Sequence, residues 1–121
     1  MASNTVVQSV PILFLYYQNR RKRALCAELL RSRKVLNAIT EIAYNLLKNF
    51  PISSKDKKTF LTTYADELEL LTKKRQYIKK YQLLTSDPKG HKLLVRILSL
   101  TLPYLLTGSL TITSNNGNQI Y

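Results

Sequence analysis

Two clusters of basic side chains are the residues in this sequence best suited to do chemistry, and the second is interleaved with tyrosines. Lysine and arginine bind phosphates by charge, and the counterions that they displace favour binding to any polyanion. The candidate nucleic-acid-binding residues are Arg20, Arg21, Lys22, Arg23, Arg31, Arg33 and Lys34 in the first cluster, and Lys73, Lys74, Arg75, Tyr77, Lys79, Lys80 and Tyr81 in the second. The pattern favours DNA contacted at its phosphates, without recognition of base sequence.

The tyrosines of the second cluster allow two interpretations. On one continuous helix, positions 73, 77, 80 and 81 lie near one another and form a mixed basic and aromatic face that could stack on bases. Alternatively, the tyrosines belong to the core and the lysines form a solvated rim, because aromatic residues at helical spacing are commonly buried. No helix-turn-helix signature accompanies either cluster, so we do not expect sequence-specific binding.

The charge of the whole chain supports a polyanionic partner. Lysine and arginine number 19 against seven acidic residues, which gives a formal net charge of +12. Such a charge on one small domain repels itself and is commonly neutralised by nucleic acid, an anionic membrane surface or an acidic protein. Solubility alone is the alternative explanation.

The residue types that serve most often as nucleophile and base are scarce. The chain has one cysteine, Cys26, and one histidine, His91, which excludes an intramolecular disulfide and a zinc site built on thiolates. We predict that Cys26 is a packed core thiol and that His91 lies in a loop or at a helix start. Their separation in sequence gives little support to a nucleophile–base pair.

The acidic residues are also poorly placed for catalysis. Asp66, Glu67 and Glu69 fall within one predicted helix beside many lysines. We expect ion pairs there, for instance Glu69 with Lys73 at i, i+4. A carboxylate metal site would need a second acidic motif, which the chain lacks. We therefore predict a protein that is not an enzyme and that holds no metal and no cofactor.

Helical patterns dominate the elements that must position these residues. Apolar residues recur at helical spacing over 35–47, and Pro51 ends that helix. Ser53 followed by Asp56 predicts a helix start, because the serine can cap the exposed amides. The stripe over 60–71 predicts one amphipathic surface helix.

Two further stretches complete the predicted domain. A segment over 77–84 precedes a turn at 87–90, and a leucine-rich helix follows over 93–106. Whether residues 25–30 join the helix at 35–47 or form a separate one stays open. The fold class is all-α, a small helical bundle of about four helices.

The two ends of the chain differ from this middle. Residues 1–19 form an apolar segment, interrupted by Pro11, that we predict to be a strand or a short packing helix. It is too short to span a bilayer, and its positive charges follow the apolar run, which is the reverse of a secretory signal. We divide the chain into this segment, a helical domain at 20–108 and a flexible tail at 109–121.

The leucine-rich helix has three possible roles. It is the central helix of the bundle, or it docks onto a capsid protein or a second copy through Leu93–Leu106, or it enters a membrane interface after the basic clusters approach anionic lipid. Interrupted by Pro103, it is too short to span a bilayer.

Residues 24–108 resemble a family of small basic proteins. The resemblance rests on Ile39-Thr40-Glu41-Ile42-Ala43-Tyr44-Asn45-Leu46-Leu47-Lys48-Asn49, Pro51-Ile52-Ser53, the lysine pairs at 73–74 and 79–80, a glycine turn at Gly90 and a leucine-rich end with Pro103. This pattern is similar to that of proteins encoded beside capsid genes in Polinton (Maverick) elements and adintoviruses, which have been likened to core protein X of adenoviruses.

The resemblance implies a virion setting and assigns no functional residue. Together with the charge, it predicts a non-enzymatic virion or mobile-element protein that binds and condenses DNA. The alternative is a membrane-associated or capsid-cementing structural protein that acts through its leucine-rich helix. We expect the protein in the virion and in the host nucleus or cytoplasm, and we do not expect it to be secreted.

Overall fold

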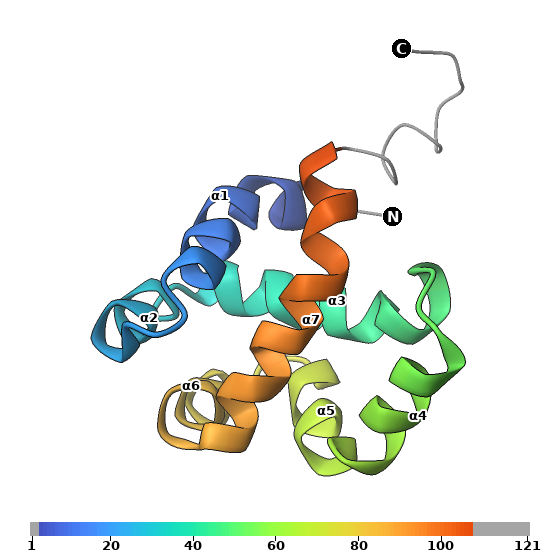
Figure 1. Cartoon of the computed structure of the whole chain (residues 1–121). Coiled ribbons are helices and arrows are strands. Elements are labelled where there is room, and N and C mark those ends of the chain that lie inside the picture. The colour runs from blue at the N-terminus through green and yellow to red at the C-terminus, as the bar shows by residue number, and fades with distance from the viewer. Residues whose placement is uncertain (1–2, 108–121) are drawn as a thin grey trace.

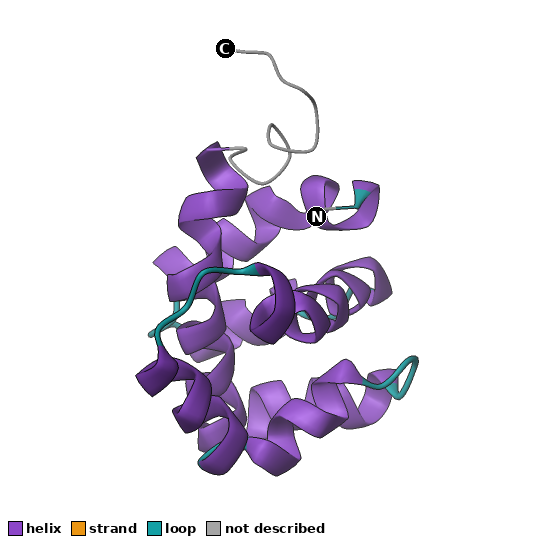
Figure 2. Cartoon of the chain, turned by 90° about the vertical axis from the view of Figure 1, so that its right-hand side faces the viewer, coloured by secondary structure: helices purple, strands orange, loops and turns teal. Residues whose placement is uncertain are grey.

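The computed structural model of the chain describes residues 3–107, in which helices are joined by short connections and no strand occurs (Figures 1 and 2). The helices are α1 (Asn4–Gln18), α2 (Arg23–Leu29), α3 (Arg33–Asn49), α4 (Ser54–Thr62), α5 (Ala65–Thr72), α6 (Tyr77–Ser86) and α7 (Pro88–Thr107). The predicted all-α class is therefore confirmed, whereas the described residues form seven helices instead of about four. The predicted flexible tail at 109–121 lies outside the described residues.

The apolar N-terminal segment is a helix, which confirms one of its two predicted forms. Ser3 caps α1 by accepting a hydrogen bond from the Val6 amide, and its own hydroxyl donates to Glu41 of α3 at 2.8 Å. α1 packs against α3 and α7, and its buried face includes Leu13 and Tyr16. Residues 4–18 therefore belong to the same packed core as the later helices.

The first helix predicted from periodicity, α3, forms the centre of the molecule. Its apolar stripe is buried, and the helix ends ahead of Pro51, as the sequence predicts. Ser32 accepts a hydrogen bond from the Val35 amide and so marks the helix start. This cap separates α3 from α2, and residues 25–29 consequently form a helix of their own.

The predicted surface helix over 60–71 is wrong in one respect, because two helices occupy this stretch. Ser53 caps α4 as expected, but α4 ends at Thr62 and α5 begins at Ala65. The hydroxyls of Thr59 and Thr62 bond back to carbonyls four residues earlier, a pattern that weakens and bends helices. The bend allows apolar side chains of both short helices to reach the core.

The predicted turn at 87–90 is wrong, because only Asp87 separates the end of α6 from the start of α7. Pro88 occupies the first position of α7, where its missing amide costs nothing, and the Asp87 carboxylate accepts from the Lys89 amide at 2.9 Å. Gly90 lies inside the helix instead of in a turn. A Cβ there would lie 2.1 Å from the Leu83 carbonyl oxygen, so glycine permits the close crossing of α6 and α7.

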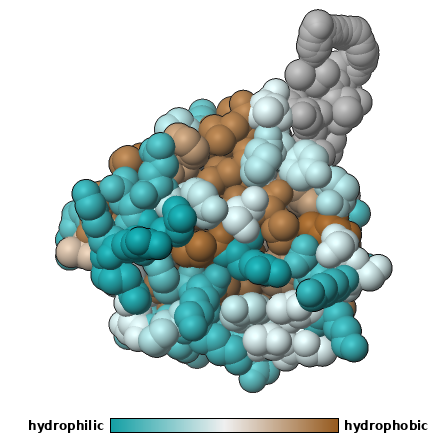
Figure 3. Space-filling view, in the orientation of Figure 1, coloured by the Kyte–Doolittle hydropathy of each residue, from teal (hydrophilic) through white to brown (hydrophobic). Residues whose placement is uncertain are grey.

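The leucine-rich stretch is the central packing helix of the domain. Leu93, Leu94, Ile97 and Leu98 of α7 are fully buried, whereas Leu106 near its end is 50% exposed. Apolar surface is concentrated in the upper half of the face in Figure 3, where α1 and α7 lie. None of the helices in the described part of the chain combines the length and apolarity needed to cross a bilayer.

Candidate nucleic-acid interface

The candidate residues are distributed over three connections and three helices. The first cluster lies around α2: the α1–α2 connection holds Arg20, Arg21 and Lys22, α2 begins with Arg23, the α2–α3 connection holds Arg31, and α3 begins with Arg33 and Lys34. The second cluster lies at α6: the α5–α6 connection holds Lys73, Lys74 and Arg75, and α6 itself holds Tyr77, Lys79, Lys80 and Tyr81. The interpretation of the second cluster as one continuous helix is therefore wrong, because residues 73–76 lie outside α6. Arg75 and Gln76 adopt left-handed backbone conformations with φ of 63° and 59°, which ends the helical path before Tyr77.

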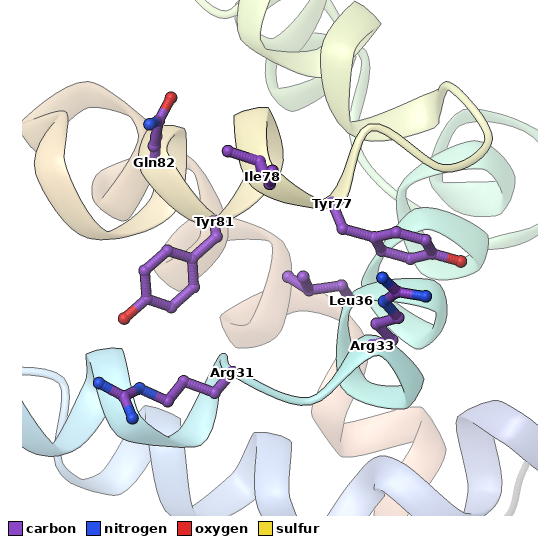
Figure 4. A pocket seen from close by; sticks show the side chains of 7 residues that line it. All are labelled: Arg31, Arg33, Leu36, Tyr77, Ile78, Tyr81 and Gln82. Atoms are coloured by element: carbon purple, nitrogen blue, oxygen red, sulfur yellow. The ribbon is translucent and has the colours of Figure 1, made fainter.

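The two clusters nevertheless meet, because α2 and α6 pack side by side in opposite directions. At the start of α2, Arg23 Nη2 donates to the Thr85 carbonyl near the end of α6, at 3.2 Å. Just beyond the other end of α2, the Arg31 side chain and the hydroxyl of Tyr81 in α6 point toward one another (Figure 4). Arginines of the first cluster thus face tyrosines of the second.

A pocket of about 420 Å³ lies at this meeting point (Figure 4). We call it the arginine–tyrosine pocket, and it is lined by Arg31, Arg33, Leu36, Tyr77, Ile78, Tyr81 and Gln82. The buried Leu36 supplies apolar surface between the two rings, whereas Ile78 is 75% exposed. A ligand with a flat apolar part and a negative charge matches this lining.

Each arginine of the pocket is paired with one tyrosine. The guanidinium of Arg33 lies 5.0 Å from the centroid of the Tyr77 ring, a cation–π contact. Tyr77 in turn donates its hydroxyl proton to Asn37 Oδ1 at 3.1 Å, which orients the ring. The neighbouring Tyr81 hydroxyl, followed by the charge of Glu28, raises the pKa of Arg31. Because the Arg31 side chain is 69% exposed, its charge remains available to solvent and to a ligand.

The structure places the two tyrosines between the core and the surface, so the predicted core packing is confirmed in part, whereas stacking on bases stays a prediction. Tyr77 and Tyr81 are half-buried and pack against the core, yet both also line the pocket. The list of candidate residues from the sequence lacks three residues at the pocket: Ile78 and Gln82, which line it, and Asn37, which accepts a hydrogen bond from Tyr77. The one signal in the sequence was Ile78, an apolar residue directly before Lys79 and Lys80.

Lys80 is the candidate that the fold removes from the surface. Its side chain is 1% exposed, and the ammonium group donates to Thr40 Oγ1 and to the Lys73 carbonyl. Burial without a carboxylate partner lowers the pKa of Lys80. Lys80 therefore cannot contact DNA, whereas Lys73, Lys74, Arg75 and Lys79 are exposed.

Cys26 and His91, the residues considered for catalysis, occupy the positions in the fold that the sequence predicts. Cys26 is buried as predicted, its thiol donates to the Asn19 carbonyl at 3.2 Å, and burial raises its pKa, which disfavours the thiolate. His91 lies in the first turn of α7, consistent with the predicted helix start. Among residues 3–107, no group of three or more His, Cys, Asp or Glu side chains is arranged to hold a metal ion.

The expected pair between Glu69 and Lys73 does not form. α5 ends at Thr72, so Lys73 is no longer one helical turn beyond Glu69. The ion pairs between described residues are Arg31–Glu28, Lys89–Glu67 and Arg96–Asp56.

Comparison with known proteins gives no relative on which to base a function. No protein-family model matches the chain, and neither a curated protein nor a solved structure matches it.

Proposed function

We propose that this protein binds DNA without catalysing a reaction, and that the arginine–tyrosine pocket is part of its interface. The observation that carries the proposal is the convergence of Arg31 and Arg33 on Tyr77 and Tyr81, which come from two separate basic clusters of the sequence. Exposed guanidinium groups can hold phosphates, and the partly exposed rings offer surface to an unstacked base.

The pocket distinguishes this proposal from charge that serves solubility alone. Solubilising charges need no particular arrangement, whereas Arg33 makes a cation–π contact with the Tyr77 ring and Arg31 faces the Tyr81 hydroxyl. Held side chains lose less conformational entropy when they bind a ligand. Three exposed lysines add non-specific phosphate contacts: Lys73 and Lys74 ahead of α6, and Lys79 within it.

The alternative is a membrane-associated or capsid-cementing protein that uses the leucine-rich helix. We favour it less, because most leucines of α7 fill the core and are not free for a partner. Its remaining support is Leu106, which is 50% exposed. The virion or mobile-element setting stays a prediction from the sequence resemblance.

The test removes two charges from the pocket and two from elsewhere. The variant R31Q/R33Q is compared with K57Q/K58Q, whose lysines are exposed on α4 and belong to no ion pair between described residues. DNA affinity is measured by fluorescence anisotropy at several salt concentrations. We expect R31Q/R33Q to bind roughly tenfold more weakly, with a slope of log K against log salt smaller by about 2, since each lost phosphate contact removes about 0.9.

The control variant should lose distinctly less affinity than the pocket variant. Equal losses in both variants would mean that DNA responds only to net charge, and the pocket would then have no special role. Wild-type binding that is weak at low salt, or insensitive to salt, would contradict DNA binding itself.

A further inference from the structure

A second basic pocket, of about 440 Å³, lies beside α7 and was not foreseen from the sequence. We call it the α7 pocket, and it is lined by Arg20, Arg21, Tyr64, His91, Lys92, Val95, Arg96 and Ser99. Its arginines and lysine come from the α1–α2 connection and from α7, which are far apart in sequence. Four permanent cations thus surround one concave space.

Two of the lining residues are fixed to the core. Arg20 Nη1 donates to the Tyr17 carbonyl at 2.8 Å, and its guanidinium lies 4.5 Å from the Tyr17 ring centroid. His91 Nδ1 lies 2.6 Å from the hydroxyl of the buried Tyr16. Burial raises the pKa of Tyr16, so its hydroxyl keeps its proton beside His91. The pocket wall is therefore formed before any ligand arrives.

The positive charge of the pocket is mostly unbalanced. Asp56 pairs with Arg96 at 2.7 Å. Within residues 3–107, no carboxylate lies at ion-pair distance from Arg20, Arg21 or Lys92. Three uncompensated cations around a preformed hollow suit a ligand with several negative oxygens, and a row of phosphate groups has this character.

The α7 pocket is separate from the arginine–tyrosine pocket. The two share no lining residue. Arg20 and Arg21 precede α2 while Arg31 and Arg33 follow it, and α2 is seven residues long, about 10 Å at 1.5 Å per residue. α6 runs antiparallel beside α2 and places its first turn at one pocket and its end near the other. The pockets therefore lie toward opposite ends of the α2–α6 pair.

We propose that the α7 pocket is a second phosphate-binding site, in which the three uncompensated cations Arg20, Arg21 and Lys92 hold consecutive phosphate groups. The ligand is either a free oligophosphate or the phosphates of a nucleic-acid backbone. In the second case, and resting on the proposed DNA binding, one domain contacts DNA at two places and condenses it without self-association.

The test uses inorganic triphosphate as the probe and His91 as the reporter. His91 is the single histidine of the chain, so its ring signals in NMR spectra need no assignment among several residues. Triphosphate is titrated at constant ionic strength into wild type, R21Q/K92Q and R31Q/R33Q, which lose two charges each. We expect a saturable His91 shift in wild type and in R31Q/R33Q, and binding about tenfold weaker in R21Q/K92Q.

The conservative variant R21K/K92R keeps both charges and should bind triphosphate nearly as well as wild type. It also provides a folded comparison should R21Q/K92Q lose its thermal transition. Equal weakening in the two charge-removing variants, or triphosphate binding that leaves His91 unshifted, would overturn the proposal whatever the outcome at the arginine–tyrosine pocket. A short DNA duplex added to R31Q/R33Q separates the sources, because only backbone phosphates held in the α7 pocket would shift His91.

Discussion

The two basic segments of this protein are alike in composition but differ in their physical environment. The segment at 20–34 contains the short helix α2, and its cations lie at both ends of that helix, most of them exposed to solvent. The segment at 73–81 begins in an irregular connection and continues into a helix whose inner face carries Tyr77, Lys80 and Tyr81. The first segment supplies charge to two pockets, and the second supplies aromatic walls to one of them.

This difference shows that charge density along a chain does not determine charge on a surface. A helix of ten residues such as α6 must place some side chains inward if it is to pack at all. In the second segment a lysine occupies such a position, whereas the connections around α2 have no inner face to fill. Four tests can sharpen or break this contrast, and they follow in order of expected effect.

The largest effect should come from adding a side chain at Gly90, where α7 crosses close to Leu83 of α6. In Gly90→Val the new side chain meets the Leu83 carbonyl and side chain of α6, since even a Cβ would lie 2.1 Å from that oxygen. We expect a loss of about 3 kcal/mol in the free energy of unfolding, as for severe overpacking, measured by urea denaturation. Lys92→Ala, an exposed change on the same helix, should change stability by less than about 0.5 kcal/mol. If Gly90→Val were as stable as wild type, the second segment would not depend on this close crossing.

An intermediate effect should come from the buried lysine. Lys80→Met removes a cation that has two hydrogen bonds but no carboxylate, and we expect about 1 kcal/mol of added stability at pH 7. Lys79→Met changes the neighbouring exposed lysine and should have almost no effect. A fall in stability for Lys80→Met would show that the two hydrogen bonds outweigh the desolvated charge.

The same pair of variants gives a pH test with a definite sign. Burial lowers the pKa of Lys80 below its value in the unfolded chain, so the unfolded state binds more protons between the two pKa values. Wild-type stability should therefore gain a rising contribution as pH increases from the folded pKa toward the unfolded one. Lys80→Met lacks this contribution and Lys79→Met retains it, so their difference in unfolding free energy should shrink as pH approaches 10. A constant difference would contradict the burial of Lys80.

The smallest effect concerns the boundary between α5 and the second segment. A double-mutant cycle of Glu69→Gln and Lys73→Gln should give a coupling energy near zero, because Lys73 lies beyond the end of α5. A pair at i, i+4 on a continuous helix would instead give about 0.3–0.5 kcal/mol at low salt. Thermal unfolding of the four proteins provides the measurement, and a clear favourable coupling would mean that the helix continues into the basic segment.

The sequence by itself determined the features that depend on neighbouring residues. Ser53 caps a helix because its hydroxyl reaches an amide three positions on, and the stripe at 35–47 specifies α3 because the helical period fixes which side chains share a face. The same local logic predicted the helical class and the burial of Cys26. Such features require no knowledge of where the rest of the chain lies.

Only the tertiary structure decided which basic groups share a pocket and which one is buried. Arg31 meets Tyr81 because α2 and α6 pack antiparallel, and Lys80 finds Thr40 because α6 also packs on α3. The break at 63–64 and the helical position of Gly90 likewise follow from what each short helix must bury and how closely it approaches its neighbour. A one-dimensional pattern specifies helix faces, but the packing of those faces against one another depends on the whole core.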